Sequence, residues 1–557
     1  MKKFSLLLLL GFLLNACASV ENLDKSAVVD KEPEQSLYAQ PKLVVGVVVD
    51  QMRYDYLTRF WDLYTDRGFK RLINQGFNCK NNHYNYVPTY TAPGHASVFT
   101  GTSPQVHGII ANNWYDKQEK KKVYCVDDNT VNGLGTTLAA GQMSPKRLET
   151  TSIADQNRLH TQFRGKSIGI AIKDRGAILP AGHSANAAYW FLGGEEGKWI
   201  SSSYYMNELP SWVQNFNANE PAKKYLNTWN TLLPIAQYTQ SGSDANAYEF
   251  GFKGKENPDF PYNLAKLAPE NGGYDILKAT PFGNSLTLDF ALAAIENEAL
   301  GKDQDTDFLT LSFSSPDYIG HNFGVNAKEI QDNYLRLDLE IAKLLEYLDT
   351  HIGKGEYTLF LTADHGAIHV PNYLKDQKIP AGYVSSSDLK KRLKNYLGEA
   401  HANVNLIENT SNNQLFLNHE LIQEKNIDAL ALAEDIKAFL LAQPEISRVF
   451  TRSEIEMNAA TEKTKLLVQN GFHQKRSGDL VFGFLPNYIS YPEKGSTHGT
   501  GFNYDTHAPL LFYGKGIRKG SSFNKTYITD IAPTIAALLG IANPNGTTGE
   551  VIVEVLD

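Results

Sequence analysis

The chain contains little cysteine, no excess of basic residues and no long apolar run in its interior. Only 3 of its 557 residues are cysteine, which excludes a scaffold held together by many disulfides. Lys and Arg number 53 against 61 Asp and Glu, a formal charge of −8 that argues against a general nucleic-acid binder. Beyond the N-terminal region no segment is apolar over the ~18 residues that a membrane-spanning helix needs. Hydrophobic residues still make up 42% of the chain, which is typical of a folded globular protein.

The N-terminus has the pattern of an export signal. Two lysines precede the apolar stretch Phe4–Leu14, which is too short to span a membrane and is typical of a signal peptide. We therefore expect residues 1–16 to be a signal peptide and residues 17–40 to be a flexible tether. The sequence Leu-Asn-Ala-Cys resembles a bacterial lipobox, so Cys17 is the expected lipid anchor of a periplasmic or outer-membrane-anchored protein. Ordinary cleavage without a lipid is the alternative, because Asn15 is unusual in a lipobox.

The two remaining cysteines, Cys79 and Cys125, form a candidate disulfide in an exported protein. A bridge between them would contribute up to roughly 4 kcal/mol in the loop-entropy model. The alternative is two separate buried thiols, and the sequence does not choose between the two.

Continuous aliphatic and β-branched runs recur along the chain and predict buried strands. Between and after them, apolar residues spaced at 3.6 residues predict helices. Strands that alternate with helices indicate an α/β fold, a mainly parallel sheet sandwiched between helices. The predicted strands are 43–50, 167–172, 308–313, 357–362 and 509–514, and the clearest helices cover 335–348 and 531–539.

Two segments interrupt this alternation. Residues 185–275 are rich in Trp, Tyr, Asn and Pro with weak periodicity, and we expect a cap or insertion there. Residues 371–495 contain their own helix and strand, and we expect an inserted α+β subdomain. The core would then be assembled from three parts, 41–184, 276–370 and 496–557.

Aspartate and histidine residues follow the predicted strands. Because ligands of an open α/β sheet gather at the carboxyl ends of its strands, these side chains should meet at one edge. Taken singly, each is commonly a turn former or a helix cap. Together, carboxylate and imidazole groups suit Zn²⁺, and six ligands favour two ions over one. The six residues are Asp50, Asp317, His321, Asp364, His365 and His498.

Thr91 is a candidate nucleophile. It precedes Pro93, which is typical of a first helical turn, and a hydroxyl there lies at the positive end of the helix dipole. Coordination to a metal would lower its pKa further. The alternative is that Thr91 only caps the helix, and the hydroxyls of Thr89 and Ser97 are close by in the sequence.

These segments together resemble the alkaline phosphatase superfamily, in its branch of phosphodiesterases and nucleotide pyrophosphatases with a threonine nucleophile. The likeness covers about residues 41–557 and is greatest to bacterial periplasmic alkaline phosphatases that use threonine. It implies two zinc ions and a phosphoryl-binding asparagine at Asn112, with Asn113 as the adjacent alternative. It assigns Asp317, His321 and His498 to one zinc, and Asp50, Asp364, His365 and Thr91 to the other.

Lys173 and Arg175 stand two residues apart just after a predicted strand. In the Thr-type phosphatases a Lys-x-Arg pair at this place binds two oxygens of a phosphate monoester, and typical diesterases of the branch lack it. The resemblance thus implies an alkaline phosphatase that hydrolyses small phosphate monoesters through a covalent phosphothreonine, with phosphate release for scavenging. We expect a monomer without nucleic-acid partners that touches the membrane only through its lipid. The alternatives are a phosphodiesterase or pyrophosphatase with the same metals, and a non-catalytic lipoprotein that binds phosphate or glycans.

Overall fold

The computed structural model describes residues 40–401, 404–457 and 459–557. The predicted signal peptide, the lipid-anchor Cys17 and the predicted tether up to residue 39 lie outside the described residues. Across the described ranges, no helix combines the length and the apolar character needed to cross a membrane.

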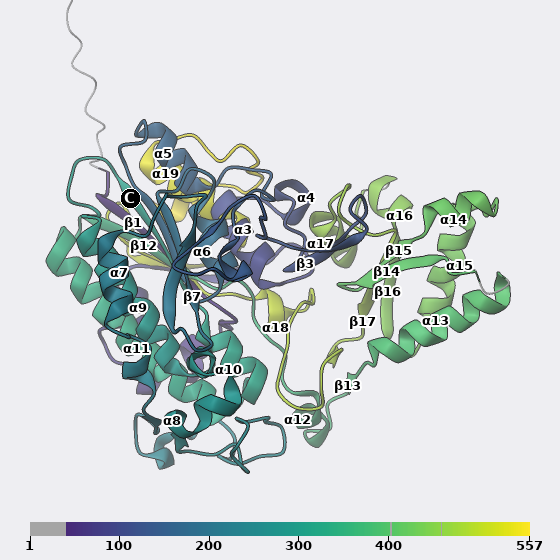
Figure 1. Cartoon of the computed structure of the whole chain (residues 1–557), viewed down its shortest axis with the longest axis horizontal. Coiled ribbons are helices and arrows are strands. Elements are labelled where there is room, and N and C mark those ends of the chain that lie inside the picture. Colours follow the sequence, from purple (N-terminus) through teal and green to yellow (C-terminus); the bar gives the residue numbers. More distant parts are fainter. Residues whose placement is uncertain (1–39, 402–403, 458) are drawn as a thin grey trace, which may run out of the picture. The chain divides into compact units, whose positions relative to one another are not determined.

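In the described part of the chain, ten strands form one central sheet (Figure 1). Its middle strands β12, β1, β11, β6 and β7 are parallel neighbours, and antiparallel strands flank them on both sides. The expected mainly parallel α/β sheet is confirmed. In spatial order the strands are β20 (Gly520–Tyr527), β2 (Phe77–His83), β19 (Leu510–Gly514), β12 (Tyr357–Thr362), β1 (Leu43–Val49), β11 (Asp307–Phe313), β6 (Ser167–Ala171), β7 (Ala187–Leu192), β8 (Lys198–Ser202) and β5 (Gly133–Leu134).

Helices cover both faces of this sheet, as alternate side chains of β7 show. Tyr189 packs edge-on against Phe290 of α9 (Pro281–Asn297), at a ring distance of 5.3 Å. The next residue, Trp190, joins a different core cluster with Ile178 of α6 (Asp174–Ala181). Helix α11 (Lys328–Leu348) packs on α9, and α3 (Thr91–Thr100) packs on α6. Successive residues of a strand point to opposite faces, so both faces are buried, as a parallel sheet requires.

A second, four-stranded sheet lies within the span 371–495. Its strands are β14 (Ile407–Ser411), β15 (Gln414–Leu417), β17 (Leu480–Phe484) and β16 (Ile446–Thr451). With helices α13 (Ser386–Ala400) and α15 (Ala429–Leu441) it encloses its own hydrophobic core, which includes Leu393, Ile436 and Phe482. β14 and β15 form a hairpin that turns at Asn412 and Asn413, both at positive φ (53° and 56°), as a two-residue hairpin turn requires. We call residues 409–412, which are the end of β14 and the first residue of the turn, the hairpin wall.

The structure corrects one expectation and decides between two alternatives. The predicted insertion 185–275 does not begin at 185, because β7 and β8 belong to the central sheet and bury Tyr189 and Trp199 in its core. Of the two alternatives for the cysteines, the structure has the separate thiols: Cys79 and Cys125 are free and buried. Cys79 lies on β2 in the main core, whereas Cys125 follows β4 (Lys121–Tyr124) and packs in a separate cluster.

Candidate active site

The predicted metal ligands lie at one edge of the central sheet. Asp50 follows β1 directly, and Asp364 and His365 come just after β12. After β11, helix α10 (Ser315–Phe323) carries Asp317 and His321 one turn apart. Because β12, β1 and β11 are adjacent and parallel, their carboxyl ends place these residues side by side. His498 arrives from the loop before α18 (Asn503–Thr506).

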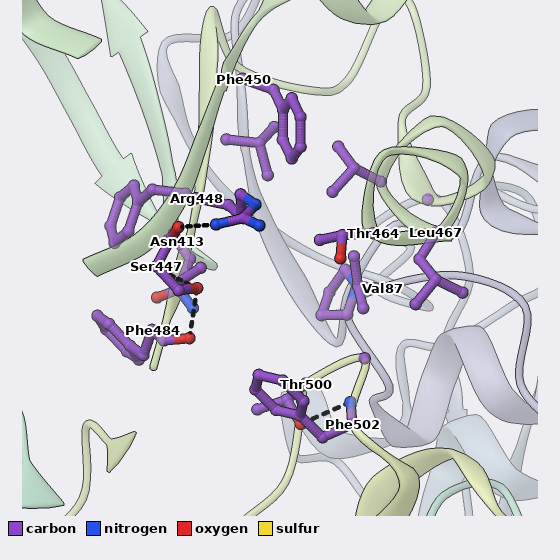
Figure 2. A pocket seen from close by; sticks show the side chains of 18 of the residues that line it. Val87, Asn413, Ser447, Arg448, Phe450, Thr464, Leu467, Phe484, Thr500 and Phe502 are labelled. Carbon is purple, nitrogen blue, oxygen red and sulfur yellow. Dashed lines mark hydrogen bonds between the residues drawn. The ribbon is translucent and has the colours of Figure 1, made fainter. Parts of the chain in front are cut away.

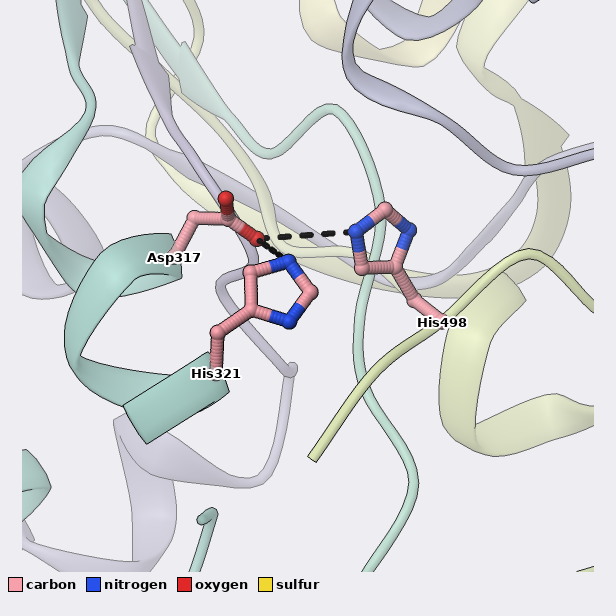
Figure 3. A group of neighbouring side chains, drawn as sticks. All are labelled: Asp317, His321 and His498. Atoms are coloured by element: carbon pink, nitrogen blue, oxygen red, sulfur yellow. Dashed lines mark ion pairs between the residues drawn. The ribbon is translucent and has the colours of Figure 1, made fainter. Parts of the chain in front are cut away.

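Figure 3 shows the first group, Asp317, His321 and His498, whose ligand atoms all lie within 4.8 Å of one another. His321 Nε2 is 3.2 Å and His498 Nε2 is 3.5 Å from the same oxygen, Asp317 Oδ1. This is the grouping that the sequence resemblance assigned to one zinc ion.

The second group differs from the expected one. It contains Asp50, Asp317 and His365, so Asp317 takes part in both. Asp364 lies beside this group, since His365 Nε2 is 3.5 Å from both Asp50 Oδ1 and Asp364 Oδ2. The other oxygen of Asp364 accepts a hydrogen bond from the backbone N–H of Gln51 at 3.0 Å. The two groups therefore share a carboxylate and form one cluster.

The protonation of the histidines suits metal binding. Each ring donates its Nδ1–H to a backbone carbonyl, which in the neutral ring leaves Nε2 unprotonated and able to bind a metal. The pairs are His321 with Ser496 at 2.7 Å, His498 with Thr89 at 2.7 Å and His365 with Gly366 at 3.0 Å.

Several buried atoms of the cluster make no hydrogen bond, although carboxylate or imidazole groups lie 3.4–3.5 Å from them. Asp50 Oδ1, Asp364 Oδ2 and His365 Nε2 have no hydrogen-bond partner among the described residues, and all three residues are fully buried. A buried carboxylate or imidazole without a partner is unfavourable unless a ligand satisfies it. The residues present therefore fit a bound metal ion.

Lys173 pairs with the same cluster. Its Nζ lies 2.6 Å from both Asp50 Oδ2 and Asp317 Oδ2, whereas the resemblance implied phosphate oxygens as its partners. Burial alone would lower the pKa of Lys173, but the nearby Asp317 and Asp50 carboxylates raise it above its ordinary value. The buried carboxylates thus hold a charged ammonium group at the site.

Thr91 is the first residue of α3 and is 1% exposed. The first turn of this helix abuts Asp364 through Gly94, where a Cβ atom would lie 2.4 Å from the Asp364 carbonyl oxygen. Asn112 Oδ1 accepts a hydrogen bond from the Ala92 N–H at 2.8 Å, which leaves the amide NH₂ of Asn112 as a donor beside the helix start. Asn112 is thereby tied to the residue that follows Thr91.

Arg175 belongs to a network that the sequence analysis missed. Its Nη1 donates to the hydroxyl of Tyr124 at 3.0 Å, and that hydroxyl donates to Asp174 Oδ1. Asp174 also accepts from the Arg175 backbone N–H at 2.6 Å. The position of Asp174 between Lys173 and Arg175 was a signal in the sequence, but nothing there pointed to Tyr124, which lies about 50 residues earlier.

Two further residues of the site were also missed. Gln51, at a φ of 62°, donates from Nε2 to Asp317 Oδ1 at 2.6 Å. His95 bonds through Nδ1 to the Thr91 carbonyl at 2.8 Å, and the same nitrogen is 3.4 Å from Asp364 Oδ2. The four-residue spacing of Thr91 and His95 on a helix could have indicated this contact.

A model of the type I phosphodiesterase / nucleotide pyrophosphatase family matches residues 44–508. The chain belongs to this family. It is 44% identical to the alkaline phosphatase PafA of Elizabethkingia meningoseptica over 521 residues, 93% of this chain and 95% of that protein. It is 46% identical to a Myroides odoratus protein named calcium-transporting ATPase over 523 residues, 93% of this chain and 95% of that protein. The crystal structure of PafA superposes with a TM-score of 0.90 at 43% identity, covering 94% of this chain and 100% of that one.

Proposed function

We propose that this family member is an exported, two-zinc alkaline phosphatase that hydrolyses small phosphate monoesters through a covalent phosphothreonine at Thr91. The observation that carries the proposal is the mostly buried cluster of Asp and His residues against the first turn of α3, which begins with Thr91. The match to PafA over nearly the whole chain supports the same activity. ATP hydrolysis, named in the Myroides relative, is also a phosphoryl transfer, the class of reaction that this site supports.

The metal identity and number are proposed from the donor set. Three imidazoles and three carboxylates are ligands that zinc prefers, and six ligands in two groups that share Asp317, with Asp364 beside them, suit two ions better than one. The residues that would hold them are Asp50, Asp317, His321, Asp364, His365 and His498, with Thr91 at the second group. When bound, the ions would neutralise developing negative charge and lower the pKa of coordinated hydroxyl groups.

The chain's own residues account for the rest of the reaction. The Thr91 oxygen attacks phosphorus, the bond to the leaving alcohol breaks, and the hydroxyl proton ends on that alcohol. The N-terminus of α3 favours negative charge on the Thr91 oxygen. Asn112, Lys173 and Arg175 would donate to the phosphoryl oxygens, where charge must be stabilised. Water then cleaves the phosphothreonine, which restores the Thr91 hydroxyl and releases phosphate for uptake.

The physiological setting is proposed from the sequence. The substrates are small molecules, nucleic acids are not partners, and the enzyme acts as a monomer in the periplasm or on the outer membrane. Its contact with the membrane is a lipid on Cys17.

Thr91→Ala tests the mechanism directly. The variant should lose several orders of magnitude in kcat on a phosphate monoester, because the nucleophile is gone, while it retains zinc measured by elemental analysis. Thr100→Ala is the matched control, since among the described residues this hydroxyl on the same helix bonds to the Ala96 carbonyl alone, at 2.8 Å. Mass spectrometry of acid-quenched wild type should find phosphate on the Thr91 peptide. Near-wild-type turnover by Thr91→Ala would remove Thr91 from the mechanism.

A further inference from the structure

A cavity of about 380 Å³ adjoins Asn112, one of the residues proposed to bind the phosphoryl group. On one side it is lined by Tyr90, which directly precedes Thr91, and by Asn112, which bonds to the start of α3. On the other side it is lined by the hairpin wall of the second sheet. A phosphoryl group held by Thr91 and Asn112 would therefore lie at its entrance.

The cavity is lined by polar, mostly uncharged residues together with three aromatic residues, Tyr90, Trp114 and Tyr115. The hairpin wall contributes Asn409, Thr410, Ser411 and Asn412, whose side chains are amides and hydroxyls. Among the lining residues that the structure describes there is no carboxylate, and the one cation is the exposed Lys122. Amides and hydroxyls both donate and accept hydrogen bonds, which suits a ligand with several hydroxyl groups. The ring of Tyr90 adds an apolar face of the kind that packs against the C–H groups of a sugar.

The hairpin wall is fixed against the core. Asn412 Nδ2 donates to the backbone carbonyl of Asn113 at 2.7 Å, across the cavity's rim. Next to it, Tyr115 packs edge-on against Phe416 of β15 at a ring distance of 5.3 Å. Groups held in place before binding lose less entropy when a ligand arrives.

A larger cavity of about 490 Å³ shares Asn412 with the first one and is mainly apolar. Figure 2 shows its walls, with Phe450, Leu467, Phe484 and Phe502 facing a common space. None of the predicted catalytic or metal-binding residues lines it. A substitution in this apolar cavity therefore serves as a control for substitutions in the more polar first cavity.

We propose that the cavity between Asn112 and the hairpin wall binds the leaving alcohol, and that the enzyme prefers phosphate esters of sugars and other polyols. This inference rests on the proposed function, because a bound phosphoryl group is what places the alcohol there. The hairpin wall would donate and accept hydrogen bonds with the alcohol's hydroxyl groups.

The test compares kcat/KM on glucose 6-phosphate and on phenyl phosphate for the wild-type enzyme and an Asn409→Ala/Thr410→Val variant. Loss of one or two hydrogen bonds to the sugar should lower kcat/KM on glucose 6-phosphate by about 10- to 100-fold. The value on phenyl phosphate, whose leaving group has no further hydroxyl, should stay within about twofold. Thr464→Val makes the same Thr-to-Val change in the apolar cavity (Figure 2) and should alter neither value.

Each other outcome is decisive. Equal losses of kcat/KM on both substrates would show that the hairpin wall has a structural role only, and would overturn the proposed subsite. Unchanged values on both substrates would also overturn it. A loss on phenyl phosphate in Thr464→Val would overturn it too, because it would place the leaving group in the apolar cavity. Failure of the wild-type enzyme to hydrolyse either ester would instead refute the proposed function. If the double variant does not fold, as judged by its melting temperature, Ser411→Ala repeats the test with a smaller change.

Discussion

Gly94 tests how closely α3 must approach the metal cluster. A Cβ atom there would lie 2.4 Å from the carbonyl oxygen and 2.7 Å from the Cβ atom of Asp364. Carbon atoms normally pack at roughly 3.5–4.0 Å, so Gly94→Ala must push the helix start and Asp364 apart by about 1 Å. The helix start carries Thr91, so the substitution moves the nucleophile relative to a proposed ligand.

The expected effects on stability and on rate are measured separately. Overpacking destabilises by roughly 1–3 kcal/mol, whereas Ala stabilises a helix over Gly by roughly 0.5–1 kcal/mol. The free energy of unfolding should therefore fall by at most about 2.5 kcal/mol. A 1 Å misplacement of reacting groups can lower a rate by about 10²-fold, which corresponds to about 2.7 kcal/mol. The folded enzyme should therefore show a kcat/KM about 10²-fold below that of the wild type.

The assay measures kcat/KM on a phosphate monoester, the melting temperature and the zinc content of the same preparations. Gly242→Ala is the control, because its Cβ atom would meet, among the described residues other than its chain neighbours, only the Asn326 carbonyl oxygen within 4 Å, at 3.6 Å. Full activity of Gly94→Ala at full zinc content would refute the claim that contact between α3 and Asp364 sets the catalytic geometry.

Further predictions concern charge, positioning, the thiols and the N-terminus. Lys173→Ala/Arg175→Ala should lower monoester hydrolysis by a few kcal/mol of transition-state stabilisation and diester hydrolysis far less, with zinc content confirmed; equal losses would favour a diesterase. Tyr124→Phe should lower kcat/KM by about tenfold or more by releasing Arg175, whereas Tyr205→Phe, whose buried hydroxyl has no partner among the described residues, should have no effect. Cys79 and Cys125 should resist alkylation in the native enzyme, since burial raises the pKa of Cys79 to about 12, and both should react in denaturant without reductant; protection that persists in denaturant would restore the disulfide. A fatty-acid analogue should label the wild-type protein and not Cys17→Ser, and equal labelling would reject the lipid anchor.

The sequence is most informative where the core is buried on both sides. All seven residues of β1 are buried, and so are all seven of β11, so their continuous apolar runs stand out from amphipathic segments. Where such a run ends in the sequence, the carboxyl end of the strand is also known. Asp50, Asp317 and Asp364 could therefore be predicted to lie close together. The direction of β19 was not predictable in this way, because a buried run reads the same in a parallel and an antiparallel strand.

Other features depend on contacts between distant segments. The aromatic residues of β7 and β8 suggested a cap because their composition resembles a surface insertion, yet Tyr189 and Trp199 pack on α9. Lys173 carries no sign in the sequence that it would pair with two carboxylates, since Asp50 and Asp317 are more than 100 residues away in either direction. The hairpin wall is short and polar, so no hydrophobic period marks it as part of a site.

The segment that carries the hairpin wall lies in the chain between His365 and His498 and has a hydrophobic core of its own. Asn412 ties the wall to the core through the Asn113 carbonyl, whereas a change of sequence at 409–411 alters neither the ligands nor Thr91. This separates two properties of the enzyme that can be inherited or engineered independently: the chemistry of phosphoryl transfer and the choice of alcohol. A library randomised at positions 409–411, with Asn412 kept, would sample new substrates while every member keeps the same ligands and nucleophile.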